Sequence, residues 1–287
     1  MSRSLLFIPG NNPSMIQNSD LYGADAVIFD LEDSVLVQHK DAARKLVKFY
    51  LEQFNLLSCK VIVRINGMET PFLKMDLDDL TYDYIDMFMI PNATHGAIEY
   101  ITNQLKELEK ERHLKKEIKL IPIIETPYAL LQVKDIVKMS RVSGLLFGAE
   151  DYSMNMSIKR TKEGSEISFA RNMISIAAKA YNKEVYDTPF IDVNDSEGLK
   201  KDILLAKSLG FSGKAAIHPR QIDLINTLFS PSQEDIFDAL RIIKEAKKDN
   251  KGAFSIDGKM VDAPIITRAK KVIEQAKLYG LIGDGDV

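Results

Sequence analysis

Two carboxylates in this sequence stand where catalytic groups are often found, each directly after a short apolar run. They are Glu125 in LIPIIETP and Asp151 in LLFGAEDY, and a helix-like stretch follows each of them. In an α/β barrel, the strand ends project such groups into a shared pocket. Two neighbouring carboxylates repel each other unless a positive charge lies between them, so the pair predicts a divalent cation. A site with one or two carboxylates, completed by water and substrate oxygens, is typical of Mg²⁺. The alternative is that each acid caps the helix after it.

A second group of charges combines three acids with one arginine. The segment FDLEDSV places Asp30, Glu32 and Asp33 at the end of an apolar run, and VRING places Arg64 inside another one. Strand alternation points Asp30 and Glu32 to the same side. A guanidinium in an apolar strand needs anionic partners, so we expect Asp30 or Glu32 to orient Arg64 while its remaining donors bind a substrate carboxylate. The alternatives are a solvated acid cluster and a purely structural ion pair.

The elements that must position these residues are short apolar runs, alternating with amphipathic stretches. The runs are residues 5–8, 26–31, 61–65, 87–90, 120–124, 144–148, 185–191 and 215–218, and the helical stretches include 41–57, 96–116, 127–139, 166–182 and 196–209. Eight strands alternating with helices are the pattern of a TIM (β/α)8 barrel. A doubly wound sheet usually opens with a glycine-rich phosphate loop, which the segment FIPGNN does not provide. The barrel is therefore the better prediction.

The last 55 or so residues exceed what eight β/α units need. We expect a catalytic barrel domain over residues 1–230 and a helix–hairpin–helix appendage over 231–287. The appendage would contain a helix from the N-cap Ser232 to about Lys248, a hairpin around Asp257-Gly258 and a helix from Asp262 to Gly280. Such an appendage either covers its own barrel or reaches the adjacent subunit.

The composition of the chain argues against several classes of protein. Its 287 residues are 45% apolar, and 38 basic against 41 acidic residues give a net charge of −3 with the charges interspersed. This is no nucleic-acid-binding signature, and no apolar run reaches the roughly 20 residues needed to cross a membrane. The first apolar run ends at Pro9-Gly10, too early for a signal peptide. With Cys59 as the single cysteine, a cytoplasmic protein is expected.

Seven segments, in this order along the chain, carry a resemblance to a known family. They are RSLLFIPGNNPSM, GADAVIFDLEDSV, VIVRING, IIETP, FGAEDY, GKAAIHPRQI and GKMVDAPII. Together they resemble the acyl-thioester lyase family of the citrate lyase β subunit, which includes malyl-CoA and citramalyl-CoA lyases. The resemblance implies a TIM barrel, Mg²⁺ on Glu125 and Asp151, and substrate binding by Arg64, Glu125 and Phe7. It also implies a cytoplasmic homo-oligomer.

The implied reaction is the cleavage of a citryl thioester to oxaloacetate and an acetyl thioester. In relatives, an aspartate matching Asp262 enters the adjacent subunit's site as the candidate base, and Asp30 and Glu32 would assist Arg64. Relatives that use coenzyme A carry basic residues in and after the PGxxP turn, where this sequence has Asn12 and Asn18. A thioester on an acyl carrier protein, with a transferase subunit in the same complex, fits this departure. The alternatives are a stand-alone lyase for citramalyl-CoA or malyl-CoA and a subunit that mainly assembles a complex.

Overall fold

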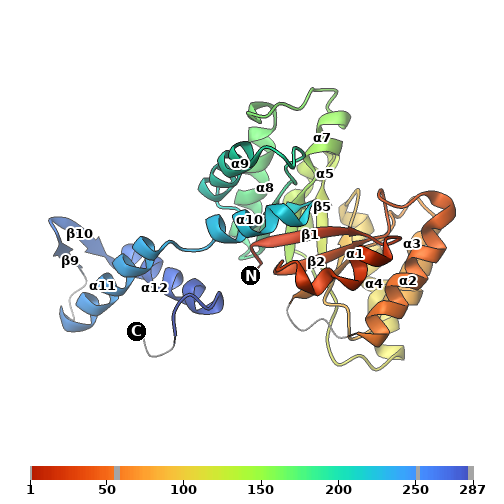
Figure 1. Ribbon diagram of the computed structural model, residues 1–287, viewed down its shortest axis with the longest axis horizontal. Coiled ribbons are helices and arrows are strands. Elements are labelled where there is room, and N and C mark those ends of the chain that lie inside the picture. Colours follow the sequence, from red (N-terminus) through yellow and green to blue (C-terminus); the bar gives the residue numbers. More distant parts are fainter. Residues whose placement is uncertain (1, 55–58, 250–252, 284–287) are drawn as a thin grey trace. The chain divides into compact units, whose positions relative to one another are not determined.

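The computed structural model describes residues 2–54, 59–249 and 253–283 of the chain. The chain divides into two compact units, Met1–Asn226 and Thr227–Val287. The first unit contains a closed barrel of eight parallel strands, so the predicted TIM barrel is confirmed (Figure 1).

The barrel closes because the first strand pairs in parallel with both the second and the last. The strands are β1 (Ser4–Pro9), β2 (Ala26–Asp30), β3 (Lys60–Arg64), β4 (Met87–Ile90), β5 (Lys119–Ile124), β6 (Gly144–Phe147), β7 (Glu184–Asp187) and β8 (Gly213–Ala216). Leu5 pairs with Ala26 of β2 and with Ala215 of β8. β7 is shorter than the predicted run 185–191, since it ends two residues before Pro189, which has no N–H for a strand ladder.

The helices of the first unit lie around the strands (Figure 1). They are α1 (Pro13–Gln17), α2 (Lys40–Gln53), α3 (Phe72–Leu80), α4 (His95–Glu111), α5 (Pro127–Leu131), α6 (Val133–Val137), α7 (Ala149–Asn155), α8 (Ser168–Ala180), α9 (Ser196–Ser208) and α10 (Ile222–Phe229), whose last three residues belong to the second unit. The single helix predicted over 127–139 is interrupted at Gln132, whose side chain accepts a hydrogen bond from the His95 backbone N–H at 3.0 Å. Among the described residues, no helix is both long and apolar enough to cross a membrane.

Alternation along the strands decides which side chains face the barrel interior. The interior cluster contains Leu5, Ala26, Ile28, Ile62, Met87, Met89, Ile121, Ile123, Leu146, Tyr186 and Ala215, with Phe7 packed against it. Continuing the same rows by two residues leads to Asp30 on β2, Arg64 on β3 and Glu125 after β5. The apolar pattern that fills the barrel therefore also aims the charged side chains into its carboxyl-terminal mouth.

The second unit has the predicted helix–hairpin–helix order. It consists of α11 (Gln233–Asp249), β9 (Ala253–Ile256), β10 (Lys259–Asp262) and α12 (Ala263–Leu278). At the start of α11, Ser232 Oγ accepts from the Asp235 N–H at 3.0 Å and Asp235 Oδ2 accepts from the Ser232 N–H at 2.9 Å, which is the expected capping box. The hairpin turns through Asp257 and Gly258, with φ of 50° and 76°, as a tight two-residue turn requires.

Candidate active site at the barrel mouth

A cavity of about 460 Å³ opens at the carboxyl ends of the barrel strands. Its volume is in the usual range for a small-molecule site. The lining includes most of the residues that the sequence singled out: Phe7, Asp30, Asp33, Arg64, Glu125 and Asp151. Among the described residues that line it, Arg64 is the one with a positive charge. The site is thus an acidic mouth with a single guanidinium.

Glu125 and Asp151 come together in this cavity, from different kinds of element. Glu125 directly follows β5 and its side chain is buried, whereas Asp151 lies in the first turn of α7 rather than at a strand end. The capping alternative is wrong for both acids. Thr126 caps α5 by accepting from the Ala129 N–H at 3.0 Å, and no side chain caps α7 at Gly148.

The two carboxyl groups interact, and the charge of Arg64 compensates them only in part. Burial, reinforced by the negative charge of Asp151, raises the pKa of Glu125 to about 8, although a hydrogen bond from the Asn92 backbone N–H opposes this rise. Burial and the charge of Asp33 raise the pKa of Asp151, which also accepts a hydrogen bond from Glu125. With a pKa of about 8, Glu125 is mostly protonated at neutral pH. A divalent cation in this position would replace that proton.

Gly148 allows the close approach of Glu125 to the start of α7. A Cβ atom at position 148 would lie 2.6 Å from Glu125 Cβ and 2.7 Å from Glu125 Oε2, distances that real Cβ atoms essentially never show. The Gly148 backbone N–H donates to the Ile124 carbonyl at 3.1 Å, which joins the ends of β5 and β6. The glycine before Asp151 is therefore needed for the carboxylates to share one space.

Arg64 is held by three acids at the end of β2 and directly after it. Its Nε and Nη2 donate to the two carboxylate oxygens of Asp30, each at 2.7 Å, which forms a bidentate pair. Its Nη1 lies 3.0 Å from Glu32 Oε2 and 3.4 Å from Asp33 Oδ2. The Phe7 ring lies below the guanidinium, with its centroid 5.1 Å from Cζ. Arg64 is thus fixed along one edge by Asp30, while its other edge faces weaker, more exposed partners.

The pKa values of Asp30 and Glu32 shift in opposite directions, although both acids contact Arg64. Burial alone would raise the pKa of Asp30, but the hydrogen bonds and charge of Arg64 outweigh it and lower that pKa. For Glu32, burial together with the charges of Asp33 and Asp30 prevails over Arg64 and raises the pKa to about 7. Asp30 is therefore a permanent anion, and Glu32 changes charge near neutral pH.

Comparison with known proteins identifies the lineage of this barrel. The sequence pattern of the HpcH/HpaI aldolase/citrate lyase family matches residues 3–219. A citrate lyase subunit beta of Haemophilus influenzae is 39% identical over 284 residues, covering 96% of this chain and 97% of that protein. The chain belongs to the HpcH/HpaI aldolase/citrate lyase family.

Other members of the HpcH/HpaI aldolase/citrate lyase family are similar over almost the same length. A mitochondrial citramalyl-CoA lyase of Rattus norvegicus is 30% identical, covering 96% of this chain and 86% of that protein. A crystal structure of the protein CitE from Mycobacterium tuberculosis, in complex with magnesium, acetoacetate and coenzyme A, superposes with a TM-score of 0.79. Its sequence is 26% identical, and the match covers 96% of this chain and 98% of that one. The resemblance stated from the seven sequence segments is confirmed.

The donor set at the mouth of this aldolase/citrate lyase barrel fits Mg²⁺. Glu125 and Asp151 offer carboxylate oxygens, the ligands that this hard cation prefers. Within residues 2–54, 59–249 and 253–283, no group of three His, Cys, Asp or Glu side chains encloses a metal position. Two such ligands would leave the remaining coordination positions to water and substrate, which is the usual arrangement for Mg²⁺ in such enzymes.

Asp262, the predicted base, belongs to the second unit. It is the N-cap of α12, where its Oδ1 accepts from the Ile265 backbone N–H at 3.3 Å. The side chain is partly exposed, and Pro264 stands just inside the helix, as predicted. Its contribution to a barrel mouth remains a prediction.

Sequence reasoning missed three contributors to the site. The Asn92 backbone N–H binds Glu125 from a residue with φ of 46°, a left-handed conformation that asparagine tolerates better than most residues. Thr188 lines the cavity directly after β7, and Gly148 makes room beside Glu125. The Pro91-Asn92 pair after an apolar run is a turn signal that pointed to the first of them.

Proposed function

We propose that the protein is an Mg²⁺-dependent carbon–carbon lyase that cleaves a citryl thioester to oxaloacetate and an acetyl thioester. The observation that carries this proposal is the meeting of the Glu125–Asp151 pair with Arg64 in one cavity, in a chain 39% identical to a citrate lyase subunit beta. The reaction moves the hydroxyl proton of the substrate to a base while the C–C bond breaks. Its electrons form the acetyl enolate, which then takes up a proton at carbon.

Glu125 and Asp151 would hold the metal. When bound, Mg²⁺ supplies Lewis-acid polarisation of the substrate's hydroxyl and adjacent carboxylate. Burial is the main cause of the raised pKa values of the two acids, and the charge of Arg64 offsets it only in part. A bound divalent cation would favour their ionised forms. The magnesium in the complex of the Mycobacterium tuberculosis protein supports the same cofactor here.

Arg64 would bind a substrate carboxylate through Nη1, the edge that Asp30 leaves open. Asp30 fixes the orientation of the guanidinium, and the Phe7 ring supports it from one side. Glu32, whose pKa of about 7 lets it change charge, would give up its contact with Nη1 when the substrate arrives. Pre-orientation by Asp30 reduces the entropy that substrate binding must otherwise remove.

Asp262 would accept the hydroxyl proton at the mouth of the adjacent subunit's barrel. This proposal requires a homo-oligomer in which the appendage of one subunit approaches its neighbour. It is supported by the motif GKMVDAP and by the position of Asp262 at the start of a helix, where a carboxylate is held in a fixed orientation.

A carrier protein in a citrate lyase complex is our preferred source of the thioester, with a cytoplasmic location. Asn12 caps α1 through the Met15 N–H at 3.1 Å, and Asn18 donates to the Ser14 carbonyl at 2.8 Å. Both residues therefore have local structural roles and provide no charge for coenzyme A phosphates. The transferase subunit of such a complex is a further expected partner.

The assay that tests this function compares citryl-, citramalyl- and malyl-CoA with a citryl carrier protein as substrates of the purified protein. We expect citryl thioesters to be cleaved, the reaction to stop in EDTA and to resume when Mg²⁺ is restored. Full activity in EDTA would contradict the metal assignment. Preference for citramalyl-CoA would favour the alternative lyase, which the 30% identity to a citramalyl-CoA lyase supports.

A subunit that mainly assembles a complex makes a different prediction. The isolated protein would then leave free citryl-CoA intact and cleave the substrate only after the partner subunits are added. We expect cleavage by the isolated protein instead, because the full set of metal and arginine ligands is present in this one chain.

Mixing two inactive variants decides in which subunit Asp262 acts. Asp262→Asn keeps a complete barrel mouth, and Glu125→Gln keeps a complete appendage. If Asp262 serves the neighbouring site, hybrid oligomers contain sites with both wild-type residues, and random mixing restores roughly a quarter of the activity. If Asp262 serves its own barrel, every mixture stays inactive. Size-exclusion chromatography of Asp262→Asn checks that assembly is retained.

A further inference from the structure

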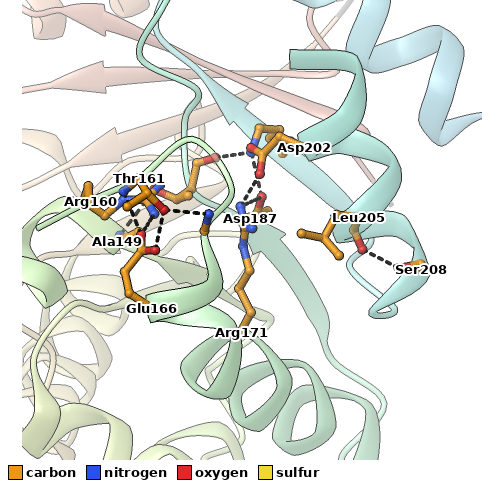
Figure 2. Close-up of polar contacts among 12 residues, drawn as sticks. Ala149, Arg160, Thr161, Glu166, Arg171, Asp187, Asp202, Leu205 and Ser208 are labelled. Atoms are coloured by element: carbon orange, nitrogen blue, oxygen red, sulfur yellow. Dashed lines mark hydrogen bonds and ion pairs between the residues drawn. The ribbon is translucent and has the colours of Figure 1, made fainter. Parts of the chain in front are cut away.

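Four charged side chains form a buried cluster on the outer side of the barrel wall, and we call them the wall cluster. They are Arg171 of α8, Asp187 of β7, Asp202 of α9 and Lys214 of β8. The Arg171 guanidinium binds both oxygens of Asp187, at 3.0 and 2.9 Å, and reaches Asp202 at 2.6 Å (Figure 2). Lys214 Nζ lies 2.6 Å from Asp187 and 2.6 Å from Asp202. Two cations and two anions thus neutralise one another between the strands and the helices.

Lys214 also binds the backbone of Thr188, a residue whose side chain faces the other side of the wall. Its Nζ donates to the Thr188 carbonyl at 2.5 Å. Asp187 and Thr188 are neighbours, so their side chains point in opposite directions: Asp187 into the wall cluster and Thr188 into the mouth cavity. One ammonium group, with 0% of its side chain exposed, therefore fixes the chain at the point where β7 ends and the cavity begins.

The Thr188 side chain continues this connection to the helix that bears Asp151. Its Oγ1 accepts a hydrogen bond from the Ala149 backbone N–H at 3.3 Å. Ala149 is the first residue of α7, and Asp151 lies two residues later in the same turn. Because no side chain caps α7 at its own N-cap, Gly148, the Thr188 hydroxyl takes over one of the free N–H groups there. Thr188 is thus the contact between the wall cluster and α7.

We propose that Thr188 is a positioning residue for the Glu125–Asp151 pair, held in place through the barrel wall by Lys214. This proposal rests on the proposed function only in taking that pair as the metal site. Thr188 and Lys214 provide no ligand to the metal; they set where α7 begins and hence where the Asp151 carboxylate lies. Partners that orient metal ligands typically affect metal affinity by roughly 10- to 100-fold.

The test compares Thr188→Val, which removes the acceptor at almost constant volume, with Thr188→Ser, which keeps it. We expect Thr188→Val to accelerate amide hydrogen exchange across residues 149–155 in the metal-free protein and to weaken Mg²⁺ binding roughly tenfold or more in calorimetry. Thr188→Ser should stay close to the wild type in both measurements. Both measurements are independent of lyase activity, so an inactive wild-type protein would refute the proposed function without deciding the role of Thr188.

The contribution of Lys214 needs a variant that preserves the charge balance. Lys214→Met combined with Asp202→Asn removes one charge of each sign, and we expect it to change α7 exchange and Mg²⁺ affinity in the same direction as Thr188→Val. Glu109→Gln is the control. It weakens a different buried ion pair, in which Glu109 of α4 lies 2.6 Å from Arg141 and which does not involve α7.

Three results would overturn the proposal. The first is a Thr188→Val protein with wild-type exchange in α7 and wild-type Mg²⁺ affinity. The second is a Thr188→Ser protein as impaired as Thr188→Val, which would show that the hydroxyl is not the responsible group. The third is a Glu109→Gln protein with the same changes in α7, which would reduce the effect to general destabilisation. Thr188→Val leaves all four charges of the wall cluster in place, so it keeps the test decisive if the double variant does not fold.

Discussion

Two groups of charged side chains face opposite sides of the same barrel wall, and they differ in their charge balance. The wall cluster contains two cations and two anions, each bound to partners of opposite charge. The mouth cluster, which consists of Asp30, Glu32, Asp33, Arg64, Glu125 and Asp151, has five acids and one cation. One cluster is neutral by itself, whereas the other is complete only when a cation arrives.

The pKa values of the acids follow this difference in charge balance. Burial opposes ionisation of Asp202 in the wall cluster, but Lys214 and Arg171 outweigh burial and lower its pKa. In the mouth cluster, burial and neighbouring acids raise the pKa of Glu125 to about 8 and also raise that of Asp151. Removing one partner of a compensated buried pair is costly, whereas buried acids with raised pKa values mark a candidate ligand site.

The largest expected effect is the loss of activity when a mouth carboxylate is removed. Glu125→Ala or Asp151→Ala should reduce Mg²⁺-dependent cleavage by roughly a thousandfold or more, since a metal contributes several kcal/mol to a charged transition state. Steady-state assays at saturating Mg²⁺ measure this change, and circular dichroism checks the fold. Variants that keep full activity in EDTA would show that the mouth cluster, like the wall cluster, needs no added cation.

Removing a charge from the wall cluster should instead reduce stability. Arg171→Met leaves Asp187 and Asp202 with Lys214 as their one remaining cation, so we expect a loss of about 3–5 kcal/mol in the free energy of unfolding. Urea denaturation measures it. The Mg²⁺ affinity of the protein that remains folded should change less than in Thr188→Val, because Lys214 still binds the Thr188 carbonyl. A fully stable Arg171→Met protein would show that the wall cluster does not support the fold.

A neutral substitution in the mouth cluster should instead increase the stability of the metal-free protein. The pKa of Glu125 is about 8 in the folded protein and near its usual value of 4.5 when unfolded. Between these values the folded protein binds a proton that the unfolded chain has lost, so the metal-free protein loses stability as the pH rises through this range. Glu125→Gln should therefore raise the melting temperature in EDTA at pH 8, and the Mg²⁺-induced increase should disappear. A lower melting temperature would contradict the raised pKa.

The same proton makes Mg²⁺ binding depend on pH. Because a carboxylate must lose its proton to bind a metal, the affinity should rise by up to about tenfold per pH unit between pH 6 and 8 and level off above the pKa of Glu125. Titration calorimetry at several pH values, in buffers of different ionisation enthalpy, also measures the proton released on binding. An affinity independent of pH in this range would show that Glu125 is already ionised in the metal-free protein.

The barrel and the inward-facing charges could be predicted because their signals are local. Each strand is a short apolar run bounded by polar residues, and one charged residue within such a run, Arg64, is conspicuous. The predicted end of β7 was wrong because Phe190 and Ile191 extend the apolar run beyond Pro189, whereas the strand ends at Asp187. The helix break lies at Gln132, whose side chain binds the backbone N–H of His95, a residue 37 positions away.

The wall cluster could not be assembled from the sequence, although two of its members carry the same signal as Arg64. Asp187 and Lys214 are also charged residues within short strands, but 27 residues separate them and nothing local pairs them. Strand alternation assigns them to the outer face only when the barrel register is known. The roles of Gly148 and of the Asn92 N–H are likewise backbone contacts between separate β/α units.

The smallest expected effect concerns Asp33, the most exposed acid of the mouth cluster. Its carboxylate lies 3.4 Å from Arg64 Nη1, where the substrate carboxylate would bind, and 67% of its side chain is exposed. Exposed ion pairs contribute about 0.2–1 kcal/mol, so Asp33→Asn should lower KM by at most about fivefold at saturating Mg²⁺ and leave kcat unchanged. Asp135→Asn, which removes an exposed acid paired with Lys138, controls for net charge. An increase in KM would mean that Asp33 binds the substrate or the metal's water ligands, and that the mouth cluster uses all five of its acids in function.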